Sequence, residues 1–302
     1  MNKLIGGSGI DVANSIQQTI DHGYIVAGYS GSSASGDVTG TTHGSNDFWV
    51  VKLDSVGTIV WNKLLGGAGS DQANSVRQTK DSGYIVAGFS TSSATGDVTG
   101  TNHGASTNDY WIVKLDGAGN IVWNKLIGGA GDEFANGIQQ KTDLCYIVGG
   151  HSTSSSNGDV ITANHGSSDY WIVKLDAVGN IVWNKLLGGI NADQANSIQQ
   201  TADLGYIIAG GSASSFSGDV SSPNHGGSDY WMLKLDASGN IVWNKLLGGA
   251  GSEIAYFARQ TFDGSYIVAG YSTSSMTGDV LKTNHGNGDC WIVKLDALGN
   301  IQ

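Results

Sequence analysis

Several residue types are almost missing from this chain: it has one proline, two cysteines and two arginines among 302 residues. Cys145 and Cys290 stand at unrelated positions, so we expect incidental thiols rather than a disulfide framework. The scarcity of arginine, together with a net charge of −11, argues against a surface that binds nucleic-acid phosphates. No apolar run approaches the roughly 20 residues of a membrane-spanning helix, so we predict no membrane span.

Helical periodicity is also absent, because no segment sustains apolar residues at positions i, i+3, i+4 and i+7. The chain instead repeats one unit five times, and such a fixed period is typical of a repeat architecture. The copies span residues 1–60, 61–122, 123–182, 183–242 and 243–302. We therefore predict a single domain built from five equivalent units.

Each copy contains four short runs of strand-forming residues separated by Gly, Asp and Asn. In the second copy these runs read ANSVRQT, GYIVAGFS, WIVKLD and NIVWNKLL. The second and third runs are apolar at nearly every position, which indicates a sheet covered on both faces. Four antiparallel strands per unit, repeated radially, predict an all-β fold, a five-bladed β-propeller. The fully apolar surroundings of four repeated tryptophans predict that they are buried between blades: Trp111, Trp171, Trp231 and Trp291.

The hairpin KLD-x-x-GN-I-V-W resembles the outer hairpin of quinoprotein-like propellers. This resemblance implies that the NIVWNKLL run is outermost and that the ANSIQQT run of the next blade lies at the axis. We expect the long polar loop and the glycine-rich link on one face, and the short turns near Asp81 and Asp116 on the other. Asn2–Ile5 and Asn300–Gln302 match two parts of one outermost strand, so we predict that these two segments share it and close the ring.

The long loop is richest in candidate binding residues, with an aspartate after glycine, a histidine before glycine and an aspartate before the third strand. We predict that they bind ligand: Asp37, His43, Asp47, Asp97, His103, Asp109, Asp159, His165, Asp169, Asp219, His225, Asp229, Asp279, His285 and Asp289. Aromatic residues stand nearby in four copies: Phe48, Tyr110, Tyr170 and Tyr230. Acids at this density would suit Ca²⁺ as a cofactor. The competing interpretation is that these side chains tie the loops together through hydrogen bonds.

Departures from the repeat are where an asymmetric catalytic centre would lie, and Glu133 and Glu253 are the only glutamates. The two arginines also share one repeat position, on the strand predicted at the axis, where they could hold an anion. The predicted lining of the central channel comprises Arg77, Arg259, Gln18, Gln78, Gln140, Gln200 and Gln260.

Over the whole chain, YIVAGYS, DYWIVKLD and GNIVWNK resemble the repeats of secreted and cell-surface bacterial and archaeal propeller proteins, often uncharacterised lipoproteins. The resemblance implies an extracytoplasmic or cell-surface setting and a binding or scaffolding role, and it supplies no catalytic residues. Repetition itself favours binding, because a lectin repeats its site whereas an enzyme breaks the repeat. We predict a monomeric, non-enzymatic propeller that recognises a glycan or a protein on its long-loop face. The alternative is a glycan-active hydrolase or lyase with a site near the central axis.

Overall fold

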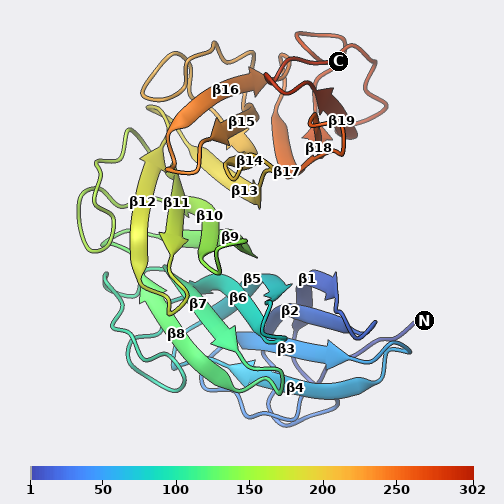
Figure 1. The fold of residues 1–302 in the computed structure, drawn as a ribbon, viewed down its shortest axis with the longest axis vertical. Helices are drawn as coiled ribbons and strands as arrows, with labels where there is room; N and C mark the ends of the chain where they lie inside the picture. Colours follow the sequence, from blue (N-terminus) through green and yellow to red (C-terminus); the bar gives the residue numbers. More distant parts are fainter. Residues whose placement is uncertain (1) are drawn as a thin grey trace. The chain divides into compact units, whose positions relative to one another are not determined.

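The computed structural model describes residues 2–302, which form nineteen β-strands and no helix. The prediction of an all-β chain built from repeated sheets is therefore confirmed. The strands follow one another along the chain in groups that match the sequence repeat (Figure 1).

Each repeat places its strands at equivalent positions. The first strands are β1 (Asp11–Gln18), β5 (Asp71–Gln78), β9 (Glu133–Gln140), β13 (Asp193–Gln200) and β17 (Glu253–Gln260). The second strands are β2 (Tyr24–Ser30), β6 (Tyr84–Ser90), β10 (Tyr146–Ser152), β14 (Tyr206–Ser212) and β18 (Tyr266–Ser272). The third strands are β3 (Asp47–Leu53), β7 (Asp109–Leu115), β11 (Asp169–Leu175), β15 (Asp229–Leu235) and β19 (Asp289–Leu295). The fourth strands are β4 (Ile59–Leu65), β8 (Ile121–Ile127), β12 (Ile181–Leu187) and β16 (Ile241–Leu247).

Within a repeat, the strands form one sheet in chain order, as in β5-β6-β7-β8, and the pairs within that sheet are antiparallel. The prediction of four strands per sheet is confirmed for four sheets and is not confirmed for the last, which has three strands, β17-β18-β19. Ile301 makes a single bridge to Leu295, and residues 2–5, predicted as strand, are not a strand here. A strand so short forms only where a neighbouring strand accepts and donates its backbone hydrogen bonds, and residues 2–5 pair with no strand of the sheets described.

The contacts divide the chain into two compact units. The first comprises residues up to Val148, Ser154–Ile161 and Lys174–Trp183, and the second comprises Gly149–Thr153, Thr162–Val173 and Asn184–Gln302. Sheets β1–β4 and β5–β8 belong to the first unit, and β13–β16 and β17–β19 belong to the second. The remaining sheet, ordered β12-β11-β10-β9, contributes residues to both units.

Large aromatic side chains fill the space between neighbouring sheets in each unit. Phe48 packs on Trp111 with ring centroids 4.5 Å apart, and Tyr170 packs on Trp231 at 4.6 Å. The predicted burial is confirmed for Trp111, Trp171 and Trp231, which are fully buried. Trp291 is only half-buried, because no fourth strand covers its side of β19.

The tryptophans of three fourth strands, Trp61, Trp123 and Trp243, pack on a turn of the next repeat. Trp61 donates its indole N–H to the carbonyl of Gly117 at 3.2 Å. Gly119, in the same turn, has a φ of +79°, and a Cβ there would come within 2.9 Å of the Trp61 ring. Glycine is therefore required at this position for both its backbone conformation and the close approach.

The first strands of neighbouring sheets lie side by side within each unit. Asn14 donates its amide to the carbonyl of Ala73 at 2.9 Å, and Asn196 donates to Ala255 at 2.9 Å. Tyr256 occupies the equivalent position in β17, so the asparagine ladder ends there. This contact supports the predicted strand order, in which the first strand of a repeat faces its counterparts.

Candidate functional site

The long loop of each repeat lies against the glycine-rich link that leads to the next repeat. In the first unit, Ser45 donates its backbone N–H to Gly69, and Asp71 donates to Asn46, at 3.0 and 2.8 Å. At the opposite end of the sheet, the turn residue Asp81 meets Lys114 near the end of β7. Loop and link therefore share one face, as the sequence predicts, and the short turns lie at the other end.

A histidine and an aspartate close each long loop on itself. In the fourth repeat, Asp229 Oδ2 accepts hydrogen bonds from the backbone N–H of His225 at 2.9 Å and from its Nδ1 at 2.6 Å. The carboxylate is fully buried, whereas 32% of the imidazole is exposed. The same contact recurs at His43–Asp47, His103–Asp109, His165–Asp169 and His285–Asp289. Because Nδ1 is occupied by the carboxylate, Nε2 is the nitrogen turned away from this bond.

The aspartate after glycine fastens the loop to the preceding link. Asp219 donates its backbone N–H to the carbonyl of Gly188 at 2.8 Å, and its Oδ2 accepts the Gly188 N–H at 3.2 Å. The same two-way contact is made by Asp37, Asp97, Asp159 and Asp279. His103 adds a contact from Nε2 to Asp159 Oδ2 at 3.3 Å. The candidate residues of each loop are thus held within a small anchored cluster, and their binding of a ligand stays a prediction.

A further acid in each link lies beneath the loop. Asp193 and Glu253 are fully buried and accept the N–H of Gly189 and Gly249, each at 2.7 Å. Burial raises the pKa of Asp193 to about 6, and it also raises the pKa of Asp169 in the adjoining loop. Because Glu133 is buried too, neither glutamate is open to a substrate from solvent.

Among residues 2–302, no three His, Cys, Asp or Glu side chains converge as a metal site of such ligands requires. Ca²⁺ held by the loops would therefore depend on carbonyl and hydroxyl oxygens for part of its shell.

The nearby aromatic residues do not line the loop face. Phe48, Tyr110, Tyr170 and Tyr230 are fully buried. Tyr170 and Tyr230 donate their hydroxyls to the carbonyls of Trp231 and Trp291, at 3.2 and 3.0 Å. The expectation that these rings accompany the loop ligands is wrong, because neighbouring sheets cover both faces of the third strands.

The residues predicted at the axis make local contacts. Three of the glutamines tie the turn of the preceding repeat: Gln78, Gln140 and Gln260 accept the backbone N–H of Ile20, Lys80 and Ala202, each at 2.8 Å. Gln200 donates to the Leu204 carbonyl at 3.4 Å, and Gln18 ends β1. Arg77 donates to the Val76 carbonyl at 2.7 Å in the first unit. Arg259 lies over the Phe257 ring at 5.3 Å in the second. A channel shared by these residues stays a prediction.

Sequence reasoning missed a lysine buried in the third strand. Lys234 is 4% exposed, and its ammonium contacts Asp203 Oδ2 at 2.8 Å and the Leu235 carbonyl at 2.9 Å. Equivalent pairs are Lys52–Asp21, Lys114–Asp81 and Lys294–Asp263. The signal was a lysine inside the otherwise apolar run WIVKL, since a buried ammonium needs a partner.

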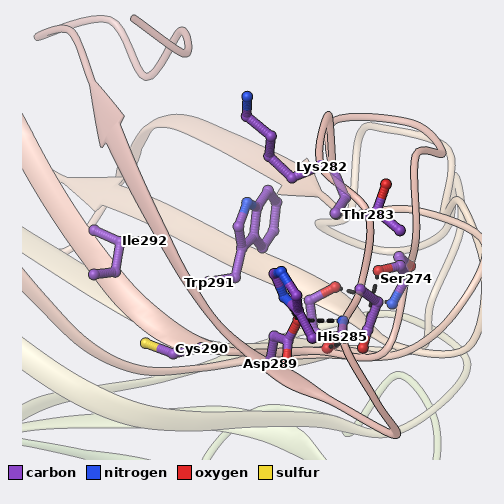
Figure 2. A pocket seen from close by; sticks show the side chains of 11 residues that line it. Ser274, Lys282, Thr283, His285, Asp289, Cys290, Trp291 and Ile292 are labelled. Carbon is purple, nitrogen blue, oxygen red and sulfur yellow. Dashed lines mark hydrogen bonds and ion pairs between the residues drawn. The ribbon is translucent and has the colours of Figure 1, made fainter.

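A groove of about 440 Å³ runs beside β19 and is lined by Trp291, Ile292, Lys282 and His285, among others (Figure 2). In the complete fourth sheet, Asn244 of the fourth strand accepts the indole N–H of Trp231 at 3.4 Å. The groove is therefore the place that a fourth strand occupies in the other sheets. No following link covers the loop of His285, unlike that of His165, and 88% of the His285 side chain is exposed.

No protein family and no curated protein matches this chain. Solved structures are similar in fold. Hydrazine synthase of Kuenenia stuttgartiensis is 13% identical, with a TM-score of 0.56 over 97% of this chain and 66% of the other. A Dyadobacter fermentans protein of unknown function is 12% identical, with a TM-score of 0.53 over 98% and 82%. The WD40 domain of Neurospora crassa Pan2 is 10% identical, with a TM-score of 0.50 over 96% and 64%.

WD40 repeats form β-propellers, and the present chain has the same kind of repeated antiparallel sheet. The fold is propeller-like. At sequence identities of 10–13%, these similarities show the fold alone and give no information on function. Residues 2–302 also include no helix that is both long and apolar enough to cross a membrane.

Proposed function

We propose that this protein is a non-enzymatic binding or scaffold propeller, extracytoplasmic or on the cell surface, whose ligand face is formed by the long loops. The anchoring of those loops is the observation that supports it. Every loop is fixed by the same His–Asp and Asp–Gly contacts, as at His225–Asp229 and Asp279–Gly248. Recognition residues commonly lie on loops held by a rigid scaffold. The buried acids argue against the alternative of a glycan hydrolase, because a substrate has no access to them.

A protein ligand fits this face better than a glycan. In the second unit, the loops of the fourth and fifth repeats expose Phe216, Met276 and Leu281, at 69%, 68% and 76%. Exposed apolar side chains among polar neighbours are typical of protein-binding surfaces. The aromatic rings of the third strands, which could otherwise stack on sugars, are buried.

Panning of a peptide-phage library, with a glycan array in parallel, tests this proposal. We expect the wild type to enrich peptides and the variant Phe216→Ser/Met276→Ser to lose that enrichment. Leu298→Ser is the matched control, because Leu298 is equally exposed, at 68%, but lies in the turn that follows β19, away from the long loops. Glycan binding without peptide enrichment would overturn the ligand class. If both variants still enrich peptides, the long loops do not form the binding face.

We propose further that the five sheets are blades of one ring, closed by Asn2–Ile5 in the groove beside β19. Residues 2–5 read NKLI, as do residues 124–127 of β8. Leu4 is fully exposed, whereas Leu126 is 7% exposed in its sheet. In the fourth sheet, Tyr230 pairs with Leu247 and Trp231 with Leu246. The same register would set Ile5 opposite Cys290 and Leu4 opposite Trp291.

Disulfide trapping tests this register with the native Cys290. In a Cys145→Ser background, Ile5→Cys should form an intramolecular disulfide under mild oxidation, seen as faster migration on a non-reducing gel. Directly opposed residues of antiparallel strands bring their Cβ atoms within bridging distance. Leu4→Cys is the control, because its side chain would lie on the other face of the strand. Cross-linked dimers would show that a second copy supplies the strand, and absence of any cross-link would refute the closure.

A further inference from the structure

Two acids face each other across the first glycine of each complete link. At Gly188, an added Cβ would lie 2.4 Å from Asp169 Oδ1 and 2.8 Å from Asp193 Oδ2. The glycine therefore leaves room for both carboxyl groups. The same arrangement occurs at four junctions: Asp47/Asp71 at Gly66, Asp109/Glu133 at Gly128, Asp169/Asp193 at Gly188, and Asp229/Glu253 at Gly248. All eight acids are fully buried.

At least one carboxyl oxygen in each pair makes no hydrogen bond, and in the Asp47/Asp71 and Asp169/Asp193 pairs two do not. Asp169 Oδ2 accepts the backbone N–H and Nδ1 of His165, at 2.9 and 2.7 Å, and Asp193 Oδ2 accepts the N–H of Gly189 at 2.7 Å. Asp169 Oδ1, which borders the same space at Gly188 as Asp193 Oδ2, makes no hydrogen bond, and neither does Asp193 Oδ1. The equivalent Oδ1 atoms of Asp47, Asp109 and Asp229 are unpartnered as well. A buried anionic oxygen without a donor is strongly unfavourable.

The surroundings supply little compensating charge. The groups that face the Asp169/Asp193 pair are His165 from its own loop and Asp219 from the next loop, which bonds to Gly188. Asp219 adds a negative charge that raises the pKa of Asp169 further. His165 is the sole cationic partner that Asp169 or Asp193 finds among residues 2–302. Two full negative charges at this site would therefore share at most one positive charge.

We propose that each of these four carboxyl pairs retains one proton at about pH 4–6, where exposed acids are already ionised, so that each pair carries a single negative charge there. A protonated carboxyl gains an O–H donor and turns the unpartnered oxygen into a group that can bond to the facing acid. Like-charged carboxyls in close contact do not both ionise, and they titrate as a pair. Burial raises the pKa of Asp71, Asp109, Asp169 and Asp229, in agreement with the geometry.

This inference goes beyond ligand binding and does not depend on it. The four protons lie where the long loops meet the links, so their release would place a second charge beneath each loop. We expect the loops to loosen as the pH rises above about 6 and these protons are lost, at all four junctions. Below that pH the four pairs would carry four negative charges in place of eight.

Carboxyl ¹³C NMR of the intact chain tests the proposal without any substitution. We expect about four Asp or Glu carboxyls to titrate above pH 6, far above the about 4 of exposed acids. Carboxyls that all titrate below pH 5 would overturn it. The spectra are repeated with Ca²⁺ and with a chelator. If a low concentration of Ca²⁺ abolishes the carboxyl titrations above pH 6, the pairs form a cation site. That result would also overturn the proposal that each pair shares a proton.

Asp169→Asn provides the second test, because an asparagine amide donates permanently where the protonated carboxyl would. We expect one high titration to disappear and the thermal midpoint at pH 8 to hold or rise. Asp219→Asn is the matched control, since that carboxylate accepts the Gly188 N–H at 3.2 Å and belongs to no pair. It should lower the midpoint, because the hydrogen bond to Gly188 loses its charge, and leave four high titrations, with that of the Asp169/Asp193 pair at somewhat lower pH. Equal destabilisation by both variants at pH 8 would refute the proposal.

Discussion

A tryptophan at one repeat position experiences two environments in this protein, depending on whether a fourth strand lies beside it. Trp171 is fully buried and donates its indole N–H to Asn184 at 3.1 Å. Trp291 packs on Tyr230 at 4.7 Å, but its other side faces the groove beside β19. The sequence predicted burial for both, because both stand in the same apolar run. The sequence pattern around a tryptophan does not show whether a fourth strand lies beside it, and the last sheet lacks that strand.

Alanine substitution should separate these two environments. Trp171→Ala removes a fully buried ring and leaves a cavity, so we expect a loss of about 3–5 kcal/mol in the free energy of unfolding. Trp291→Ala should cost about as much where Asn2–Ile5 fill the groove as proposed, and clearly less where that side of the ring stays in water. Urea denaturation measures both variants. Equal losses would mean that the Trp291 side is covered in solution, as the proposed ring closure requires.

The third strand combines an apolar run with one buried ammonium, and this ammonium links the strand to the turn between the first two strands of the same sheet. Lys114 is 4% exposed and contacts Asp81, which lies in the turn between β5 and β6. Burial alone would raise the pKa of Asp81, but the Lys114 ammonium and the Thr79 hydroxyl lower it to about 2. The strands themselves were predictable from β-branched and aromatic runs. The ion pair was not, because its partners lie 33 positions apart.

A double-substitution cycle tests this pair at the element scale. Asp81→Ala should destabilise by about 1–3 kcal/mol, because it leaves a buried ammonium with only the Leu115 carbonyl. Lys114→Met keeps most of the apolar contact, so the double variant should lose less than the sum of the two single losses. Strict additivity in urea denaturation would show that the contact contributes nothing. Lys125, which is half-buried on β8 and contacts Asn180 Oδ1 at 3.5 Å instead of a carboxylate, offers a control for removing any lysine.

At the scale of the molecule, the repeat predicted more of the fold than of the candidate site. Five copies with four strand-like runs were enough to predict repeated antiparallel sheets. The predicted number of strands was not found in the last sheet, which lacks a fourth strand. The site differs because its determinants are burial and hydrogen bonding. The sequence shows that Asp169 and Asp193 recur, but not that both are fully enclosed across Gly188. Chain spacing alone does not reveal which acids face one another.

The two classes of acid predict an unusual dependence of stability on pH. The pKa of Asp81 is lowered to about 2, so its contribution is present above pH 4 and is lost as the pH falls toward 2. The pKa of Asp193 is raised to about 6, so its contribution is present below pH 4 and is lost as the pH rises through 6. Each group changes the free energy of unfolding by up to about 1.4 kcal/mol per pH unit in its window.

We therefore expect maximal stability near pH 4–5, below the usual range of about pH 5–8. Urea denaturation between pH 3 and pH 8 measures the profile. Asp193→Asn should flatten its alkaline side, because the amide cannot lose a proton there. Asp81→Asn should flatten its acid side and leave the alkaline side unchanged. A free energy of unfolding that rises steadily from pH 4 to pH 7 would mean that the buried pairs are fully ionised in the folded protein, and the facing carboxyls would then need a bound cation to remain buried.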